Sequence, residues 1–342
     1  MTVSETMSAA VLRDPGAPEP LRIERVPTPQ PGPGEVLVAV GALGLNNAEI
    51  LQCRGAMPAP AGGVPGLECA GSVVAVGAGV ATPRLGDRVA VLARAGTYAE
   101  YVAVPVGACL RIPDELDLVA AAALPEAAAT AWWNLAHRGR LRAGERVLVH
   151  GAAGGVGSLA VQLARGLGAT VIGTARGPAK TALCAELGCH HVIDYGAEDV
   201  FGALRRIVPG GVDVVLDNQG AATVADNIAA LAPQGRLVVV GVASGTDAAV
   251  DLGALMAGTV EISSSSLGRL DDDTRSALCR EVETEILPKV VTGSVRPVLD
   301  AASFTFDEIA TAQRRFTAPD RIGKVTVTMP GYIVKTDANQ RN

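Results

Sequence analysis

Residues 150–157, with the sequence HGAAGGVG, constrain the fold of this chain more than any other stretch. Residues 147–149 before them are all apolar, as in a buried parallel strand, and apolar residues in 159–167 after them recur at helical spacing. Because glycine adopts positive φ easily and has no Cβ, such a turn lets the backbone approach a pyrophosphate at the positive N-terminus of a helix. The spacing is G-x-x-G-x-x-G instead of the commoner G-x-G-x-x-G, and a tight strand-to-helix connection without a ligand is the alternative interpretation.

The chain changes in character along its length. From residue 147 onward, apolar strand patterns alternate with helical patterns, which predicts an α/β unit with a six-stranded, doubly wound parallel sheet. Its expected strands are 147–149, 170–174, 191–194, 212–217, 237–240 and 260–264. Before residue 114, short strand patterns broken by Pro and Gly predict a compact β-rich unit instead, with strands at 9–12, 21–26, 36–40, 69–76, 89–92 and 98–104.

Three further elements connect or follow these units. An Ala-rich helical pattern runs from Leu118 to Arg138, with a break predicted at Pro125. A helix is predicted after Gly268, and the last strands are predicted at 295–299 and 325–328. These last strands are expected to return to the first unit.

Composition narrows the possible partners. The chain has 342 residues, 49% hydrophobic and 19% charged, which indicates a folded protein of two domains. The net charge of −6, without a basic tract, argues against nucleic acid and against an anionic membrane surface, so small molecules are the expected partners. Residues 1–10 lack the basic segment and apolar core of a secretory signal, so a cytoplasmic location is expected.

Several short segments carry a family resemblance. They are LNNAE at 45–49, PGLE at 65–68, YAEYV at 98–102, LPEA at 124–127 and IGKV at 322–325. Together with the glycine turn, they resemble the zinc-free medium-chain dehydrogenases/reductases of the NADPH:quinone oxidoreductase family, in the branch of the tumour-suppressor-inducible quinone reductase. The resemblance implies a GroES-like β-rich catalytic domain, residues 1–122 and 268–342, split around a Rossmann NADPH-binding domain, residues 123–267.

No metal site is expected. Zinc-dependent relatives carry a G-H-E motif, and Leu67 takes the place of its histidine here. The six cysteines are scattered, without a C-x-x-C pair or the clustered cysteine lobe of those relatives. Alcohol dehydrogenation by a Lewis-acid metal is therefore disfavoured.

The residues after the second strand of the parallel sheet favour NADPH. An Asp or Glu there would bind the ribose hydroxyls of NAD, but the sequence is TARG at 174–177. Arg176 and Lys180 suit a 2′-phosphate, and the resemblance places a phosphate-binding Lys and Tyr at Lys180 and Tyr195. The alternative is that Arg176 and Lys180 are ordinary solvated charges.

Further cofactor contacts are expected in the glycine turn and where strands end, at the carboxyl edge of the sheet. These residues are Ala153, Gly154, Gly155, Val156, Gly157, Asn218, Val240, Gly241, Val242, Ser263, Ser264 and Ser265. The serines are unusually polar for a buried sixth strand, so they either meet the cofactor or lie in a subunit interface. Thr130 and Lys324 are added through the resemblance alone.

The candidate substrate-side residues are Asn46, Tyr98 and Glu49. The resemblance places Asn46 beside the nicotinamide, and Tyr98 is predicted to face the cleft between the domains. Each has a structural alternative: Asn46 as a helix N-cap, Glu49 as a first-turn acid and Tyr98 as a core residue. Met57 stands close to where relatives carry a tyrosine. A flexible thioether in place of a phenol leaves open an acceptor other than a simple quinone.

The expected function is hydride transfer from NADPH to a quinone or an α,β-unsaturated carbonyl compound, with carbonyl polarisation by Asn46 or a backbone donor. The alternatives are a pathway-specific enoyl reductase and an NADPH-binding protein with little turnover. A homodimer is expected, because 260–266 forms the last strand of an open sheet and an uncovered edge invites pairing.

Overall fold

A computed structural model describes residues 3–330 of the chain. Residues 331–342, which the sequence assigns to the catalytic domain, lie outside the described residues. The chain divides into two compact units: a discontinuous unit, Met1–Glu126 with Asp271–Asn342, and a central unit, Ala127–Leu270. Within 3–330, no helix is both long and apolar enough to cross a membrane.

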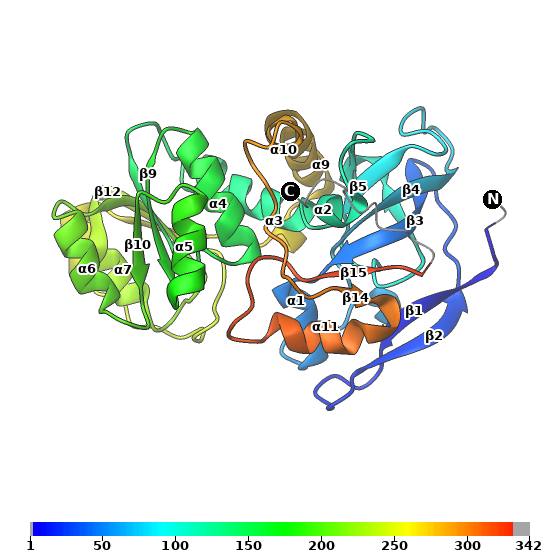
Figure 1. Ribbon diagram of the computed structural model, residues 1–342, viewed down its shortest axis with the longest axis horizontal. Coiled ribbons are helices and arrows are strands. Elements are labelled where there is room, and N and C mark those ends of the chain that lie inside the picture. The colour runs from blue at the N-terminus through cyan, green and yellow to red at the C-terminus, as the bar shows by residue number, and fades with distance from the viewer. Residues whose placement is uncertain (1–2, 331–342) are drawn as a thin grey trace, which may run out of the picture. The chain divides into compact units, whose positions relative to one another are not determined.

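The central unit contains the predicted doubly wound sheet. Its strands are all parallel and lie in the order β10-β9-β8-β11-β12-β13. Three of them, β9, β10 and β12, are labelled in Figure 1. Their bounds are β8 Arg146–Val149, β9 Thr170–Ala175, β10 His191–Asp194, β11 Val212–Asp217, β12 Leu231–Val239 and β13 Glu261–Ser264. The direction of winding reverses between β8 and β11, which is the position where open α/β sheets bind ligands. The predicted Rossmann fold is confirmed.

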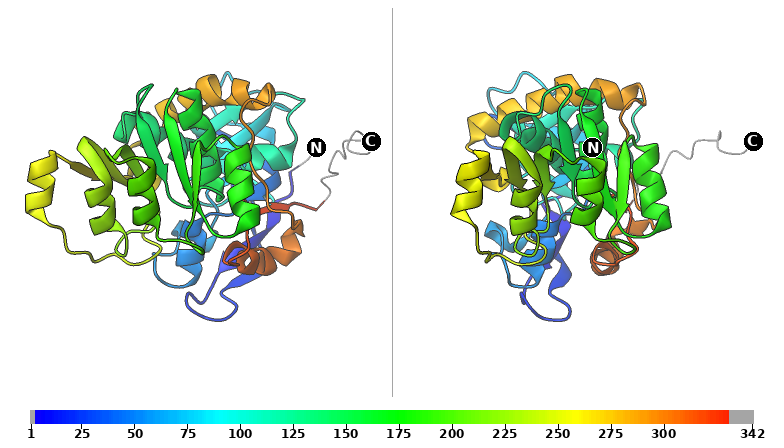
Figure 2. Two further views of the ribbon diagram at one scale, coloured as in Figure 1. Left: turned by 60° about the vertical axis from the view of Figure 1, so that its left-hand side comes forward. Right: turned by 90° about the vertical axis from the view of Figure 1, so that its left-hand side faces the viewer.

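Helices pack along both faces of this sheet (Figure 2). They are α4 Gly155–Gly166, α5 Pro178–Glu186, α6 Val200–Ile207, α7 Val224–Ala230 and α8 Leu252–Gly258. On one face, Leu148 and Ile172 of the sheet pack with Leu204 of α6 and Ile228 of α7. Burying these apolar side chains fixes which face of each strand points inward.

The last strand, β13, is an exposed edge, whereas the sequence predicted a buried sixth strand. Ile262 on β13 is 42% exposed, and Met256 on the neighbouring α8 is 81% exposed. The physical reason is that an edge strand has a hydrogen-bonded neighbour on one side only, and α8 contributes no buried residue that would cover it. The serines at the end of this strand are therefore not anomalous core residues.

The discontinuous unit is β-rich, in agreement with the predicted GroES-like domain. Strands β1 and β2 form an antiparallel pair, and the larger sheet has the order β14-β15-β3-β4-β5-β7, with β6 also paired to β3. The bounds are β1 Thr6–Leu12, β2 Leu21–Pro27, β3 Glu35–Gly44, β4 Glu68–Val76, β5 Arg88–Leu92, β6 Tyr101–Pro105, β7 Cys109–Arg111, β14 Phe304–Thr305 and β15 Thr326–Thr328. Its core is built from apolar side chains of β3, β4, β5 and β6 together with α11 and β15.

The helical segments outside the parallel sheet are short. They are α1 Asn47–Cys53, η1 Ala61–Gly63, η2 Val106–Ala108, α2 Leu118–Ala122, α3 Pro125–Trp132, η3 Trp133–Arg138, η4 Leu267–Arg269, α9 Asp272–Glu281, η5 Val282–Ile286, α10 Leu287–Val291, η6 Phe306–Glu308 and α11 Ile309–Phe316. The break predicted at Pro125 separates α2 from α3, as expected for a proline at a helix start.

Two strand predictions in this unit are wrong. Residues 295–299 form no strand: Leu299 makes a single bridge to Lys324, and Pro297 lacks the N–H that a ladder requires. Tyr98 precedes β6 instead of beginning it, and its backbone N–H is used by Pro65 O in a loop contact.

Candidate functional site

The glycine turn joins β8 to α4 in the central unit. Gly151 has φ +64°, a conformation that favours glycine, and a Cβ on Gly157 would lie 2.9 Å from the Cα of Ala152 and would also overlap Gly151 O. Gly151 is thus required by its positive φ, and Gly157 by the close approach of α4 to the turn. The third, Gly154, is the N-cap of α4, and a Cβ there would meet only Gly151 O, at 3.3 Å.

The N-terminus of α4 fits a pyrophosphate group. The N–H groups in the first turn of any α-helix have no intrahelical acceptor, and no side chain caps those of this twelve-residue helix. These groups belong to Gly155, Val156 and Gly157, which are among the predicted contacts. Uncapped N–H groups and the helix dipole together favour a bound anion.

The buried side chain of His150, at the start of the glycine turn, lies beside a threonine that binds the turn. His150 Nδ1 lies 3.2 Å from Thr174 Oγ1, and its Nε2 lies 2.8 Å from Asn227 Oδ1. Thr174 Oγ1 also accepts a hydrogen bond from Gly151 N, at 3.3 Å. Burial lowers the pKa of His150, so the neutral ring is favoured. Sequence reasoning gave neither Thr174, near the end of β9, nor Asn227, within α7, a role, because a contact between residues distant in the chain leaves no local signal.

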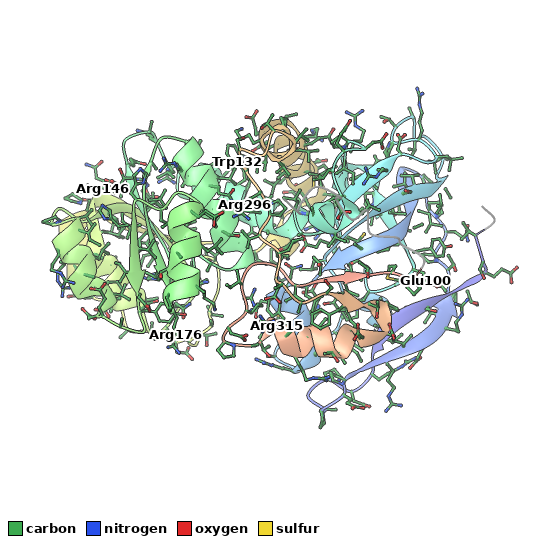
Figure 3. The ribbon with its side chains drawn as sticks, viewed as in Figure 1. Glu100, Trp132, Arg146, Arg176, Arg296 and Arg315 are labelled. Carbon is green, nitrogen blue, oxygen red and sulfur yellow. The ribbon has the colours of Figure 1, made fainter. Side chains whose placement is uncertain are left out.

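Arg176 lies at the carboxyl end of the sheet, after β9, and Arg146 lies at the opposite end, at the start of β8 (Figure 3). The Arg176 guanidinium stacks over the ring of Tyr195, 5.0 Å from its centroid. Lys180 lies in the first turn of α5. The structure therefore brings Arg176 and Tyr195 together from adjacent strands.

A carboxylate that sequence reasoning missed lies close by. Asp194, at the end of β10, accepts hydrogen bonds from Gly177 N at 3.0 Å and from Gly196 N at 2.8 Å through Oδ1. These two backbone donors lower the pKa of Asp194. Because one of its oxygens already holds the turn around Arg176, Asp194 has a structural role here. Its signal in the sequence was its place at a strand end, next to Tyr195.

The predicted residues at the other strand ends take different roles. Asn218 is exposed after β11, and Val240 and Gly241 donate their N–H groups to Asp217 O. Val242 is 45% exposed. Ser263 and Thr130 are half-buried and Ser264 is exposed.

Asn134 links two of the predicted residues. Ser265 Oγ donates to Asn134 Oδ1 at 2.7 Å, and Asn134 Nδ2 donates to Thr130 O at 2.8 Å. Asn134 is fully buried, and it had no role in the sequence predictions. The hydroxyl of Ser265 is therefore already used within the central unit.

In the discontinuous unit, Asn46 is the N-cap residue of α1 and is buried. Its Oδ1 accepts a hydrogen bond from Lys324 Nζ at 2.6 Å, and its Nδ2 donates to Glu68 Oε1 at 3.0 Å. Lys324 is only 4% exposed and forms an ion pair with Glu68, so it is not a surface lysine.

Glu49 and Tyr98 lie deeper than the sequence suggested. Glu49 accepts hydrogen bonds from Asn46 N at 2.9 Å and from Leu67 N at 3.0 Å, so both carboxylate oxygens hold backbone. Burial raises the pKa of Glu49 to about 8, against the opposing effects of its own backbone N–H, of Lys324 and of the Leu67 N–H. Tyr98 is a fully buried core residue, and its hydroxyl has no hydrogen-bond partner among the described residues. Tyr98 is therefore a core residue, as its structural alternative proposed, and it does not line a surface.

The residues present do not fit a zinc site. Leu67 has no ligating side chain, and its N–H is used by Glu49. Over residues 3–330, no group of three His, Cys, Asp or Glu side chains is arranged to hold a metal ion. No step of the chemistry is therefore assigned to a metal.

Two protein-family models match the chain. An alcohol dehydrogenase GroES-like domain matches residues 32–114, and a zinc-binding dehydrogenase domain matches residues 155–283. The rat synaptic vesicle membrane protein VAT-1 homolog is 36% identical over 324 residues, which cover 89% of this chain and 78% of the relative.

Solved structures agree with these matches. A quinone oxidoreductase from Pseudomonas syringae superposes with a TM-score of 0.85 at 31% identity, covering 94% of this chain and 99% of that one. A mycobacterial protein solved with NADPH superposes with a TM-score of 0.83 at 31% identity and the same coverage. The fold, the uncapped glycine turn and these similarities agree with one another. The chain therefore belongs to the medium-chain dehydrogenase/reductase family, as a quinone oxidoreductase-like member with a nicotinamide cofactor.

Proposed function

We propose that this protein transfers hydride from NADPH to a small electron-poor acceptor, a quinone or an α,β-unsaturated carbonyl compound. The observation that carries the proposal is the cationic end of β9, where Arg176 is held over the Tyr195 ring and the nearby Asp194 is engaged with backbone N–H groups. A planar guanidinium matches a phosphate better than it matches ribose hydroxyls. The similarity to a quinone oxidoreductase and to a protein solved with NADPH supports the same function.

The chain's own residues have separate tasks in this proposal. When bound, NADPH supplies the hydride chemistry. The first turn of α4 binds the pyrophosphate, and Arg176 and Lys180 bind the 2′-phosphate. Asn46 Nδ2 donates to the carbonyl oxygen of the acceptor, where negative charge develops. No side chain is assigned as an obligatory proton donor, since solvent suffices to protonate a hydroquinone.

A specific enoyl reductase is the second candidate. Met57, which follows α1, is 39% exposed, and it stands close to where the resemblance expects a tyrosine. A flexible thioether adapts to apolar substrates that a phenol would not accommodate. This exposure favours a larger or more apolar enone over a simple quinone.

The test gives purified protein NADPH or NADH together with a panel of quinones, enals and enoyl thioesters, and follows the absorbance of the reduced nicotinamide. Oxidation of NADPH that depends on a quinone or enal is the expected result. Oxidation with enoyl thioesters alone would favour the second candidate, and NADPH binding without oxidation by any acceptor would favour a protein with little turnover. Arg205→Ala, at an exposed position of α6, is a control for the loss of a surface arginine.

A further inference from the structure

Glu68 and Lys324 form a buried ion pair beside Asn46 that neither the predicted site nor the proposed reaction explains. Glu68 is 0% exposed and Lys324 is 4% exposed. Burying an isolated charge costs free energy of folding. A buried ion pair offsets this cost only when its remaining hydrogen-bonding groups also have partners. The partners of each atom therefore show what the pair does.

The backbone leaves space for the carboxylate. Glu68 begins β4 and lies opposite Gly44, the last residue of β3. A Cβ on Gly44 would overlap Glu68 Oε1 and would lie 2.8 Å from Ala122 O. Any side chain at position 44 would displace the carboxylate, so this strand end is shaped to hold it.

All three hydrogens of the Lys324 ammonium are used within the discontinuous unit. Nζ donates to Leu45 O at 2.9 Å and to Asn46 Oδ1 at 2.6 Å. The third partner is Glu68 Oε1. Because an ammonium has only three donors, none is left for a ligand.

Glu68 is similarly committed. Its Oε1 accepts from Lys324 and from Asn46 Nδ2, and its Oε2 accepts from Glu126 N at 2.9 Å. The pair therefore acts on other residues of the chain instead of on a bound molecule.

The pair fixes which way the Asn46 amide is turned, in the same sense as the capping box of α1, in which the Asn46 side chain faces the backbone N–H of Glu49. An ammonium only donates and a carboxylate only accepts, so the atom facing Lys324 is Oδ1 and the atom facing Glu68 is Nδ2. Turning the amide over would place NH₂ against ammonium and carbonyl oxygen against carboxylate. Among residues 3–330, Nδ2 makes one hydrogen bond, to Glu68, so its second hydrogen remains available.

We propose that Glu68 and Lys324 are positioning residues that hold Asn46 as a hydrogen-bond donor, so that the group it binds is a carbonyl oxygen. Two carbonyl groups share this chemistry: that of the hydride acceptor and that of the nicotinamide carboxamide. The effect on turnover rests on the proposed function, but the orientation of the amide is a property of the ligand-free chain.

The first test measures that orientation without cofactor or substrate. Side-chain amides of Asn are labelled with ¹⁵N, the Asn46 signal is identified by its loss in Asn46→Ala, and the exchange of its protons with water is measured. The paired variant Glu68→Gln/Lys324→Met leaves no unpaired buried charge, and Gln accepts either orientation of the amide. Exchange should become faster by about tenfold, as expected for loss of one hydrogen bond to a charged group.

The second test is a double-mutant cycle on kcat. Asn46→Ala is made in the original chain and in the paired variant. If Glu68 and Lys324 act through Asn46, the substitution costs much less in the paired background. A loss confined to kcat identifies the acceptor as the carbonyl partner, and a loss of NADPH affinity identifies the carboxamide.

A matched control removes a different ion pair. Glu145→Gln/Arg236→Met, in the central unit, should lower the melting temperature without changing the exchange of the Asn46 amide. Equal exchange rates in the original chain and the paired variant would overturn the inference. So would a loss of kcat from Asn46→Ala that is equally large in both backgrounds. Changed exchange with an unaltered kcat in Asn46→Ala would support the orientation and contradict the role of Asn46 in the proposed function.

Discussion

Arg176→Ala should weaken NADPH binding and leave NADH binding nearly unchanged. A hydrogen bond from a guanidinium to a phosphate contributes about 1.5–3 kcal/mol, which corresponds to roughly ten- to a hundredfold in affinity. The side chain is exposed, so water screens part of this interaction, and the lower end of the range is expected. The only difference between the two cofactors is the 2′-phosphate, so the ratio of their dissociation constants isolates the contact.

The stacking of Arg176 on Tyr195 provides a second, smaller test of the same geometry. An exposed cation–π contact is worth about 0.5–1 kcal/mol, so Tyr195→Ala should weaken NADPH by roughly two- to fivefold. Tyr195→Phe keeps the ring and should change little. The two dissociation constants are measured by quenching of intrinsic fluorescence or by calorimetry, with Arg205→Ala as the control. Equal losses for NADPH and NADH in Arg176→Ala would refute the assignment of a phosphate to this end of the sheet.

Four further predictions follow from the site and the fold. Elemental analysis of protein purified without added metal should find no stoichiometric zinc, and turnover should survive chelators, because Leu67 cannot ligate a metal. Light scattering at micromolar concentration should give twice the 34.7 kDa chain mass, and Ile262→Lys on the exposed β13 edge should shift it to the monomer; a monomer in the original chain would exclude the dimer. Asn46→Ala should lower kcat by roughly tenfold to a thousandfold with little change in NADPH affinity, whereas a loss of stability alone would assign Asn46 only to capping α1. The pKa of His150 is lowered by burial from 6.5, so the unfolded chain binds more protons there and the free energy of unfolding should fall as pH drops below about 6.5; an unchanged pH slope in His150→Gln would contradict this linkage.

The central unit was predictable because its signals are local. Most of the parallel strands contain a short apolar run, and the turn after each strand is marked by glycine or a polar residue within a few positions. The glycine turn between β8 and α4 depends only on neighbouring residues, so its sequence determines its shape. What local patterns did not show was exposure: β13 was expected to be buried in spite of its serines, and its position at the edge of the sheet makes it a surface.

The polar cluster around Asn46 was only partly predictable. Asn46 and Lys324 were identified by resemblance, but their contact joins residues 278 positions apart, which no periodicity reports. Glu68 belongs to the PGLE segment, but the sequence offered a reason to consider only its neighbour Leu67, which stands in the place of a zinc-binding histidine. Tyr98 illustrates the reverse case, because a polar residue between glycine-rich turns suggested an accessible surface and the fold buries it completely.

The discontinuous unit has a consequence for the order in which the chain folds during synthesis. Lys324 and β15 belong to the last part of the chain, and β15 inserts between β14 and β3, which is made near the beginning. A nascent chain that ends before Lys324 contains Glu68 without its cation and β3 without one of its partners, whereas the central unit already has all of its own strands. On the ribosome, the cofactor-binding half is therefore able to mature first, and the Asn46 cluster is completed only when the final segment emerges.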